Sequence, residues 1–557
     1  MSERGAMPQP QWTEPLHLPK TGRDHLGLLE VSSGQILPSL SPAIIVVTNH
    51  PRYHSFYAFI LQEFWERDLP RTPKAFKRFY RPIEFVFSVG VQQCDRPTHG
   101  ELGGIIGSQR TAALARSDAA TYDPTYEYIQ SSLGGYGLYY RGVMDSMGFI
   151  VPGGLGIPTT TPESSDPVTL DIDVPTPRGT QLAHAFREAV RETEYFRKHL
   201  ASTDPLPRTV VTEFGRAACL CGLSDPDAPD RDLLLGQFLH HGDGAPARRS
   251  TFRMLLDIAE QTDGHPMDAA TFRRLVYLGY AGDAKYAPLP EMEPTHYRWR
   301  LYQAREYYAF ALNALWAYFC DWGLRSGGDF RPLPLQDFYA HIDESLDFDS
   351  LAQAFDLPQP ALKADSRWVA LLEWLTSSIQ ESAERANGAR VFDEHRLYEL
   401  IRTRLGEPVL IPACVALLGL IASRFSAPSH QARPEWEVAR MGRHDRLSLN
   451  HFLRDLRSWR AEEGTVSDVM RPIIQAYIVR QHLTVARSKL PENTLRFERE
   501  DGGLRFYPHS NQVTFADSRY DSLSTHLHEL GLCGDFAEAA HAPTPEGHEL
   551  LRAGDLK

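Results

Sequence analysis

The residues of this chain that could support chemistry include two closely spaced cysteines. Cys219 and Cys221 could offer two thiolates to zinc, and His240 and His241 follow downstream. A structural zinc site draws on ligand pairs two to four residues apart at both ends. Free cysteine is among the most buried side chains, so we interpret Cys219 and Cys221 as buried thiols. We therefore predict no bound metal and no cofactor.

The common catalytic signatures are absent from the sequence. It contains no Gly-Lys pair for a phosphate-binding loop, no Gly-x-Ser-x-Gly and no His-Glu-x-x-His. His444-Asp445 resembles the dipeptide of HD-type metal-dependent phosphohydrolases, but the flanking ligands of that family are not identifiable, so we interpret these two residues as polar side chains on the surface. His526 and His528 lie two apart on an expected helix and point in different directions. We predict a non-catalytic protein, with a nuclease of scattered carboxylates as an alternative.

Two basic stretches could meet a polyanion. Residues 67–81 hold six basic residues and one acidic residue, and residues 440–489 hold ten against five. A nucleic acid would use such cations on its phosphates. We favour a solvated helix face for the first stretch because its cations share one side of a helix. The candidate binding cations of the two stretches are Lys74, Lys77, Arg78, Arg81, Arg480 and Arg487.

Composition places these residues in a folded, multi-domain chain. The 557 residues carry a net charge of −13, with 42% hydrophobic residues and six cysteines. The cysteine usage fits a reducing compartment, and the longest uncharged apolar run, 409–422, is too short to cross a bilayer. We predict a cytoplasmic protein without a membrane partner. The expected parts are a helical segment 1–100, a module 101–200, an acidic helical middle 201–430, a basic helical segment 431–493 and a module 494–557.

The module at 101–200 has the most informative pattern. Helices are expected near 107–116 and 124–132, and a third from about 136 is closed by Gly148 before a strand at 149–151. After a loop, a second strand at 168–174 precedes a helix that begins at Thr176-Pro177. The third helix offers Tyr136, Tyr139, Tyr140 and Arg141, and Arg178 begins the last.

The C-terminal module repeats this order in shorter form. A helix from residue 518 ends at Gly531, a short strand follows, and Thr544-Pro545 begins a last helix. Both modules share Gly after a helix and Thr-Pro-x-Gly at the start of the next. The presented helix here offers Arg519, Tyr520, Ser522 and His526.

These two modules resemble winged helix-turn-helix domains, in which a third helix and a β-hairpin wing form a recognition surface. The resemblance covers residues 101–200 and about 494–553. It implies that Tyr139, Tyr140, Arg141 and Arg178 of the first module, and Arg519, Tyr520 and His526 of the second, contact DNA or a partner protein. Few of these side chains are cations, so protein docking is the more natural use.

The middle of the chain is expected to be helical. Apolar residues between 299 and 325 recur at alternating spacings of four and three, which predicts one long packed helix. Further helices are expected at 205–242, 248–262, 366–387, 394–405, 409–425, 447–460 and 466–488. The fold class is therefore mainly α, a multi-domain helical protein with two small winged-helix modules.

Two broader resemblances bear on function. Two end modules around a helical middle look like kleisin-type subunits of SMC complexes. The segment 22–61, with Gln481-His482-Leu483 and residues 494–506, is similar to uncharacterised bacterial proteins found among anti-phage defence genes. We expect a scaffold or adaptor subunit of a DNA-associated complex, with protein subunits as partners, duplex DNA as a second partner and homo-oligomerisation open. A stand-alone DNA-binding regulator is the other alternative.

Overall fold

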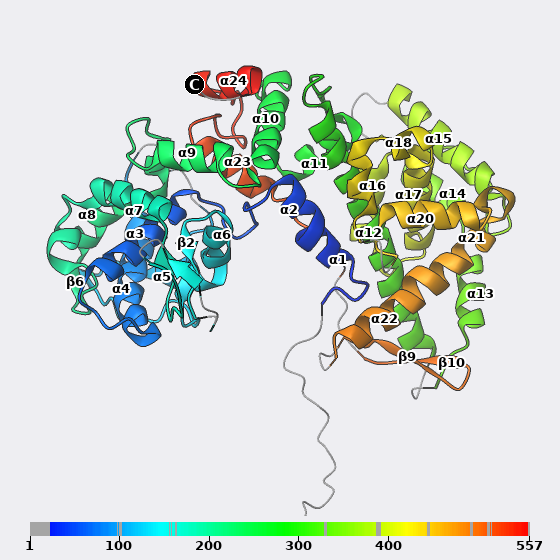
Figure 1. Ribbon diagram of the computed structural model, residues 1–557. Helices are drawn as coiled ribbons and strands as arrows, with labels where there is room; N and C mark the ends of the chain where they lie inside the picture. The colour runs from blue at the N-terminus through cyan, green and yellow to red at the C-terminus, as the bar shows by residue number, and fades with distance from the viewer. Residues whose placement is uncertain are drawn as a thin grey trace, which may run out of the picture. The chain divides into compact units, whose positions relative to one another are not determined.

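The computed structural model describes residues 23–554 apart from 97–98, 100–102, 155, 157–158, 162–163, 328–330, 386–390, 443–445, 491–493, 509–512 and 514. The chain is mainly helical, with small antiparallel two-stranded sheets (Figure 1). It forms two compact units: unit 1 from the described parts of Met1–Gln35 and Leu301–Ala516, and unit 2 from Ile36–Arg300 and Asp517–Lys557. Each unit combines segments distant in sequence, unlike the five consecutive parts expected.

Unit 2 holds most of the short strands. Its N-terminal part contains α2 (Leu37–Leu40), α3 (Arg52–Glu66), α4 (Pro73–Val91), α5 (Ser108–Arg116), β1 (Thr121–Tyr122), η2 (Tyr136–Tyr140), α6 (Arg141–Ser146), β2 (Ile150–Val151), β3 (Thr159–Thr161), β4 (Ser164–Val168), β5 (Val174–Pro175) and α7 (Pro177–Val190). It continues with η3 (Tyr195–His199), β6 (Leu206–Pro207), α8 (Arg208–Ala218), η4 (Leu220–Ser224), α9 (Arg231–His240), α10 (Ala245–Gln261), α11 (Ala269–Leu278), β7 (Tyr280–Ala281), β8 (Ala284–Lys285), α23 (Tyr520–Glu529) and α24 (Pro545–Ala553).

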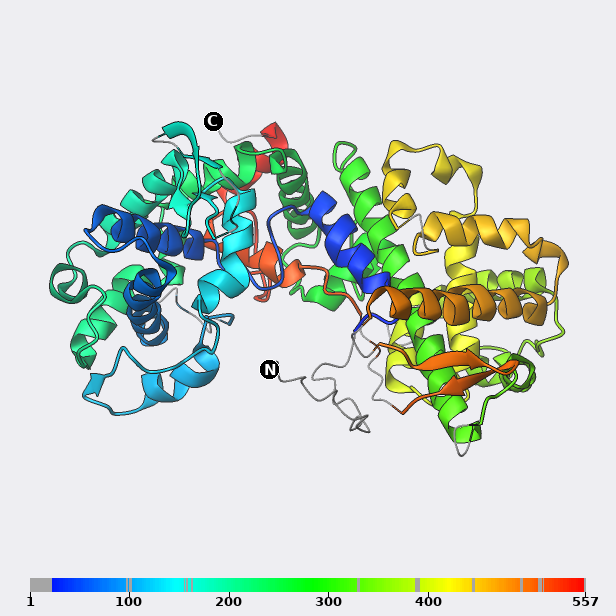
Figure 2. The same cartoon turned by 60° about the horizontal axis from the view of Figure 1, so that its bottom comes forward.

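Unit 1 is a helical assembly with one hairpin. It contains α1 (Leu28–Val31), most of η1 (Ser32–Ile36), most of α12 (Glu293–Ser326), α13 (Leu335–Ser345), α14 (Phe348–Ala354), α15 (Trp368–Arg385), α16 (Glu394–Thr403), α17 (Leu410–Phe425), α18 (Pro428–Gln431), η5 (Pro434–Trp436), α19 (Glu437–Arg440), α20 (Leu449–Ser458), η6 (Ala461–Glu463), α21 (Val466–Ile473), η7 (Ile474–Arg480), α22 (Gln481–Ser488), β9 (Phe497–Glu500) and β10 (Gly503–Phe506). Figure 2 shows β9 and β10 as a pair of antiparallel arrows.

The long apolar patterns of the middle region are confirmed as core helices. The stripe at 299–325 lies in α12, a single helix of 34 residues. The apolar run at 409–422 lies in α17, which packs against α13, α14, α15 and α16 and is buried along nearly its whole length. The expected helix at 205–242 is instead broken into α8, η4 and α9. Among the described helices, none has both the length and the apolarity needed to cross a bilayer.

The order of elements expected between 136 and 190 is present, and we call these residues the front motif. α6 follows η2 directly, and Gly148, with a φ of 71°, ends this helical segment. β2 then pairs with β5, and β3 pairs with β4 between them. The Thr176 hydroxyl accepts a hydrogen bond from Gly179 N, which caps α7. The strand expected at 168–174 is divided between the end of β4 and β5.

Residues 520–553, the back motif, repeat the same junction bond for bond. The Thr176 hydroxyl donates to Gly148 O at 2.7 Å, and the Thr544 hydroxyl donates to Gly531 O at 2.8 Å. In both copies the threonine N donates, at 3.0 Å, to the carbonyl of the residue that follows the helix-ending glycine, Phe149 or Leu532. In both copies a Cβ on the third residue after the threonine, Gly179 or Gly547, would overlap the carbonyl of Phe149 or Leu532. The repeated glycine and threonine positions predicted from sequence therefore have one geometric cause.

The two motifs differ in what joins their strands. The front motif carries the β3–β4 hairpin, whereas the back motif has one isolated bridge between Cys533 and Pro543 among its described residues. α7 packs on α3, and α24 packs on α10 (Figure 1). The module expected at 494–553 is also divided, since β9 and β10 belong to unit 1 and the back motif belongs to unit 2.

The helix expected at 124–132 is absent. The Asp123 carboxylate accepts hydrogen bonds from the N and the hydroxyl of Thr125, which closes a turn instead of capping a helix. Arg81 of α4 then donates to two backbone carbonyls of this segment. These tertiary hydrogen bonds take the place of helical ones.

Candidate functional site

A broad groove of about 980 Å³ lies beside the front motif in unit 2. Val46 and Val47 are 44% and 46% exposed, and Leu138 is 50% exposed. These three are among the seven large hydrophobic side chains that are exposed in the described chain, so apolar exposure is concentrated here. The lining is completed by Asn49, Gly104, Ile105, Ile106, Gly107, Ser108, Gln109, Arg110, Tyr128, Ile129, Gln130, Ser131 and Tyr139.

The groove has little charge. Among the described residues that line it, Arg110 is the one that is ionised, and it donates to the carbonyl of Glu127 at 3.0 Å. The rest of the lining is apolar side chains, amides, hydroxyls and glycine backbone. Such a surface matches apolar side chains and neutral hydrogen-bonding groups.

The front motif forms one wall of the groove through η2. Leu138 and the half-buried Tyr139 face it. Tyr140, which we expected to be presented with them, is buried and donates to His50 O at 3.3 Å. Burial raises the pKa of the Tyr140 hydroxyl well above its usual range. The tyrosine run is therefore split between a packed side and a groove side.

Another part of the lining is a loop held by α23 and by Arg519, the residue before this helix. Arg519 is buried and donates to the carbonyls of Ser41 and Ile44, at 3.1 and 2.8 Å. The Ser522 hydroxyl donates to Ile45 O at 3.0 Å. The loop that bears Val46 and Val47 is thus fixed on α23. In this way the back motif supports the groove without lining it.

These contacts correct the expectation that α23 presents a recognition surface. Arg519, Tyr520 and His526 are all buried. Tyr520 donates to Met267 O at 2.8 Å and stacks on Phe272. The polar side of an amphipathic helix has the same kinds of residue whether it faces water or hydrogen-bonds to buried carbonyls. The sequence therefore could not show whether the polar side of α23 is exposed or buried.

A buried ion pair joins α23 to His50, which follows the groove residue Asn49. His50 Nδ1 lies 2.6 Å from Glu529 Oε1, and His50 Nε2 lies 2.6 Å from Gly103 O. Burial alone lowers the pKa of His50, but the charge and hydrogen bond of Glu529 raise it above its ordinary value. This pair holds the loop at 103–107 against α23.

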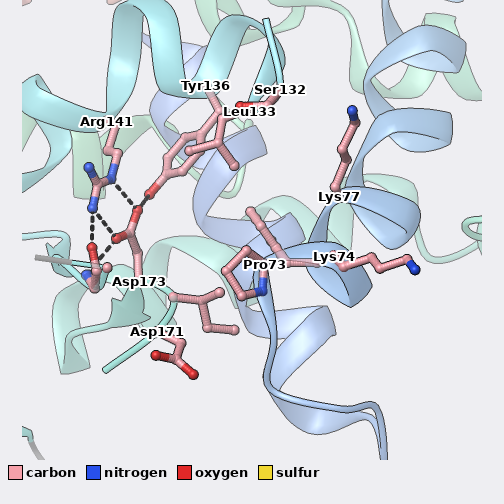
Figure 3. A pocket seen from close by; sticks show the side chains of 13 residues that line it. Pro73, Lys74, Lys77, Ser132, Leu133, Tyr136, Arg141, Asp171 and Asp173 are labelled. Atoms are coloured by element: carbon pink, nitrogen blue, oxygen red, sulfur yellow. Dashed lines mark hydrogen bonds and ion pairs between the residues drawn. The ribbon is translucent and has the colours of Figure 1, made fainter. Parts of the chain in front are cut away.

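A second, smaller cavity of about 450 Å³ lies on another side of η2. Its buried carboxylate, Asp173, accepts hydrogen bonds from Arg141 Nε and Nη2, both at 2.8 Å, from Gly153 N at 2.7 Å and from the Tyr136 hydroxyl. Figure 3 shows this carboxylate between Arg141 and Tyr136. Hydrogen bonding to Asp173 raises the pKa of Arg141. Arg141, expected to meet a ligand, thus ties the front motif to the base of its hairpin.

The remaining candidate cations are mostly exposed. Lys74, Lys77 and Arg78 are exposed on α4, and in Figure 3 the amines of Lys74 and Lys77 point away from Asp173. Arg81 is half-buried over the Tyr128 ring. Arg178 of α7 is exposed in unit 2, and Arg480 and Arg487 are exposed in unit 1.

The structure brings together a side-chain group that sequence spacing did not reveal. Cys94 and His99 lie against Cys219 and Cys221, and one ligand atom from each lies within 4.8 Å of every other. His240 and His241, the histidines considered from sequence, are exposed elsewhere. His444 and Asp445 lie outside the described residues. Among the described residues this is the one group of three or more Cys, His, Asp and Glu able to hold a metal.

Some of the residues that carry the resemblance to defence-associated proteins meet in the core of unit 1, whereas residues 36–61 belong to unit 2. Gln481 Nε2 donates to Leu26 O at 3.1 Å, and His482 Nδ1 lies 3.2 Å from His25 O. Arg496 N donates to His482 Nε2 at 3.0 Å. All of these side chains are buried, so their contacts secure the packing of the N-terminal segment on α22.

Comparison of the chain with protein-family models, with curated proteins and with solved structures found no match.

Proposed function

We propose that this chain is a non-catalytic adaptor that holds an apolar segment of a partner protein in the groove of unit 2. The observation that carries the proposal is the concentration of exposed Val46, Val47 and Leu138 around one large, nearly uncharged hollow. Exposed apolar surface of this kind costs free energy in water and is typical of interaction sites. The winged-helix resemblance supports the same use, because Leu138 and Tyr139 lie on the helix that such domains present.

A protein occupant fits the groove better than a duplex. Nucleic-acid affinity depends on cations that neutralise phosphates, and the groove offers Arg110. The loop sequence 152–170, which includes the wing, contains Glu163 and Asp166 and no lysine or arginine. An apolar side chain from a partner would instead cover Leu138 and the two valines.

A second binding function is favoured by a separate observation. Lys74, Lys77 and Arg78 are exposed together on α4, and no acidic residue lies in the first turn of that helix. We propose that these cations contact the phosphates of duplex DNA, which would place the adaptor in a DNA-associated complex. The resemblance to proteins from anti-phage defence genes supports the same setting in the bacterial cytoplasm.

Site-specific photo-crosslinking tests the occupant. A photoreactive phenylalanine replaces Leu138 in the full-length chain, expressed in its native host, and crosslinked proteins are identified by mass spectrometry. The matched control replaces Leu233, which is 39% exposed on α9 of the same unit. We expect one protein to be crosslinked at Leu138 and not at Leu233.

The alternatives give different results in the same experiment. Crosslinks to a second copy of the chain would make the groove an oligomer interface and would replace the partner proposed here. Crosslinks to DNA, or the same proteins at Leu138 and Leu233, would refute protein docking in the groove. The DNA function is tested by a gel shift at low salt with Lys74→Glu/Lys77→Glu protein, which should lose most of its affinity.

A further inference from the structure

The group formed by Cys94, His99, Cys219 and Cys221 has the composition of a metal site. Cys94 follows the end of α4, Cys219 follows the end of α8, and Cys221 lies in η4. Three thiols and one imidazole are soft ligands, which select zinc over calcium or magnesium. The ligands therefore come from two stretches, 94–99 and 219–221, that lie far apart in sequence.

The distances fit one tetrahedral ion. Cys219 Sγ lies 3.2 Å from both Cys221 Sγ and His99 Nδ1, and Cys94 Sγ lies 3.9 Å from Cys221 Sγ. Sulfur atoms bound to one zinc at 2.3 Å with tetrahedral angles are about 3.8 Å apart. The Cys94–Cys221 distance matches this value, and the Cys219–Cys221 distance is about 0.6 Å shorter.

Burial makes the site closed. Cys94, Cys219 and Cys221 are 9%, 0% and 4% exposed, and His99 is half-buried. Four protein ligands leave no position for water or substrate, which is the arrangement of structural zinc sites and not of catalytic ones.

The packing below the site brings its ligands together. α4 and α8 cross with Gly90 against Gly215, where a Cβ on either glycine would overlap the backbone of the other helix. Cys94 and Cys219 each follow four residues later, so the close crossing places both helix ends side by side. The helix crossing thus brings Cys94 close to Cys219, although the two residues are distant in sequence.

The charges around the site suit a bound anionic complex. Three thiolates, one neutral imidazole and Zn²⁺ carry a net charge of −1. The guanidinium groups of Arg52 and Arg96 both lie against Gly222, next to Cys221. Arg52 is neutralised by Asp230 at 3.2 Å and donates to Cys219 O, so Arg96 is the cation that offsets the complex.

We infer that Cys94, His99, Cys219 and Cys221 bind one Zn²⁺ in a closed structural site that fastens the ends of α4 and α8 to η4. This inference is independent of what the groove binds. It replaces the interpretation of Cys219 and Cys221 as simple buried thiols.

Metal analysis of the full-length chain, purified without chelators, tests the inference. We expect one zinc per chain in elemental analysis and in native mass spectrometry. Cys219→Ser should lose most of that zinc. Cys533→Ser, which removes a buried thiol from the back motif of the same unit, should keep it.

Cobalt substitution separates ligation from folding. The Co²⁺ form should show intense thiolate-to-metal charge transfer, and His99→Cys should keep one metal and strengthen this absorption by about a third, because a fourth thiolate joins three. A zinc-free wild-type chain, a Cys219–Cys221 disulfide seen as a loss of two hydrogens, or an unchanged cobalt spectrum in His99→Cys would overturn the assignment.

Discussion

Asp173→Asn should destabilise unit 2 because it removes the charge at the centre of the front motif. The carboxylate accepts four hydrogen bonds, two from Arg141 and one each from Gly153 N and the Tyr136 hydroxyl. Asparagine keeps the shape but turns an NH₂ group toward these donors. Arg141 loses its counter-ion, although its side chain is 27% exposed and water takes over part of the loss.

The expected loss of unfolding free energy follows from these contacts. Breaking a buried charge pair costs about 3–5 kcal/mol, and the partial exposure of Arg141 brings the expected loss to about 3 kcal/mol. Unit 2 has about 300 residues, so its unfolding entropy is about 0.6 kcal/mol per degree and the melting temperature should fall by about 5 °C.

Differential scanning calorimetry of the full-length chain measures this shift. The control is Asp171→Asn, two residues away, where the carboxylate is exposed and little change is expected. Equal shifts for Asp173→Asn and Asp171→Asn would refute the reasoning, because the network would then contribute nothing beyond surface charge.

Two further changes test the packing of unit 2. Burial lowers the pKa of His54 and of His526 to about 3. Below about pH 6.5 these histidines take up protons in the unfolded chain but not in the folded chain. The free energy of unfolding should therefore fall as the pH drops from 6.5, by about 2 kcal/mol per histidine at pH 5. Urea unfolding at pH 7 and 5 should show His54→Phe losing about half of this dependence; an unchanged dependence would mean that other groups cause it. Gly179→Ala and Gly547→Ala should each cost about 3 kcal/mol because the added methyl meets a carbonyl, whereas Gly142→Ala, which has open space in α6, should be neutral or slightly stabilising. Equal unfolding free energies for Gly179→Ala and Gly142→Ala would contradict the tight junction.

Local patterns predicted the junctions and the core helices well. Gly148 and Gly531 end helices with positive φ, and Thr176 and Thr544 cap the next ones, because backbone conformation and capping depend on a few adjacent residues. The apolar periodicity of α12 was readable for the same reason.

The Cys/His group and the groove could not be predicted from the sequence because both depend on long-range contacts. Cys94 and Cys219 are 125 positions apart, and nothing in the spacing Cys-x₄-His or Cys-x-Cys indicates that α4 and α8 cross at Gly90 and Gly215. The groove was equally hidden, since Val46 and Leu138 belong to a loop and a helix that meet only in the folded unit. Sequence predicted a helix from about residue 136, but not which side of it packs.

We propose that the groove of unit 2 holds a partner protein. The most direct measurement is the amount of that partner that co-purifies from the native host with wild-type, Leu138→Glu and Leu233→Glu chains, each at equal expression. Removing an apolar anchor of about 2 kcal/mol should reduce the partner about thirtyfold for Leu138→Glu and leave Leu233→Glu unchanged. Undiminished recovery of the partner with Leu138→Glu, or a loss that follows only neutralisation of Lys74 and Lys77, would contradict the account.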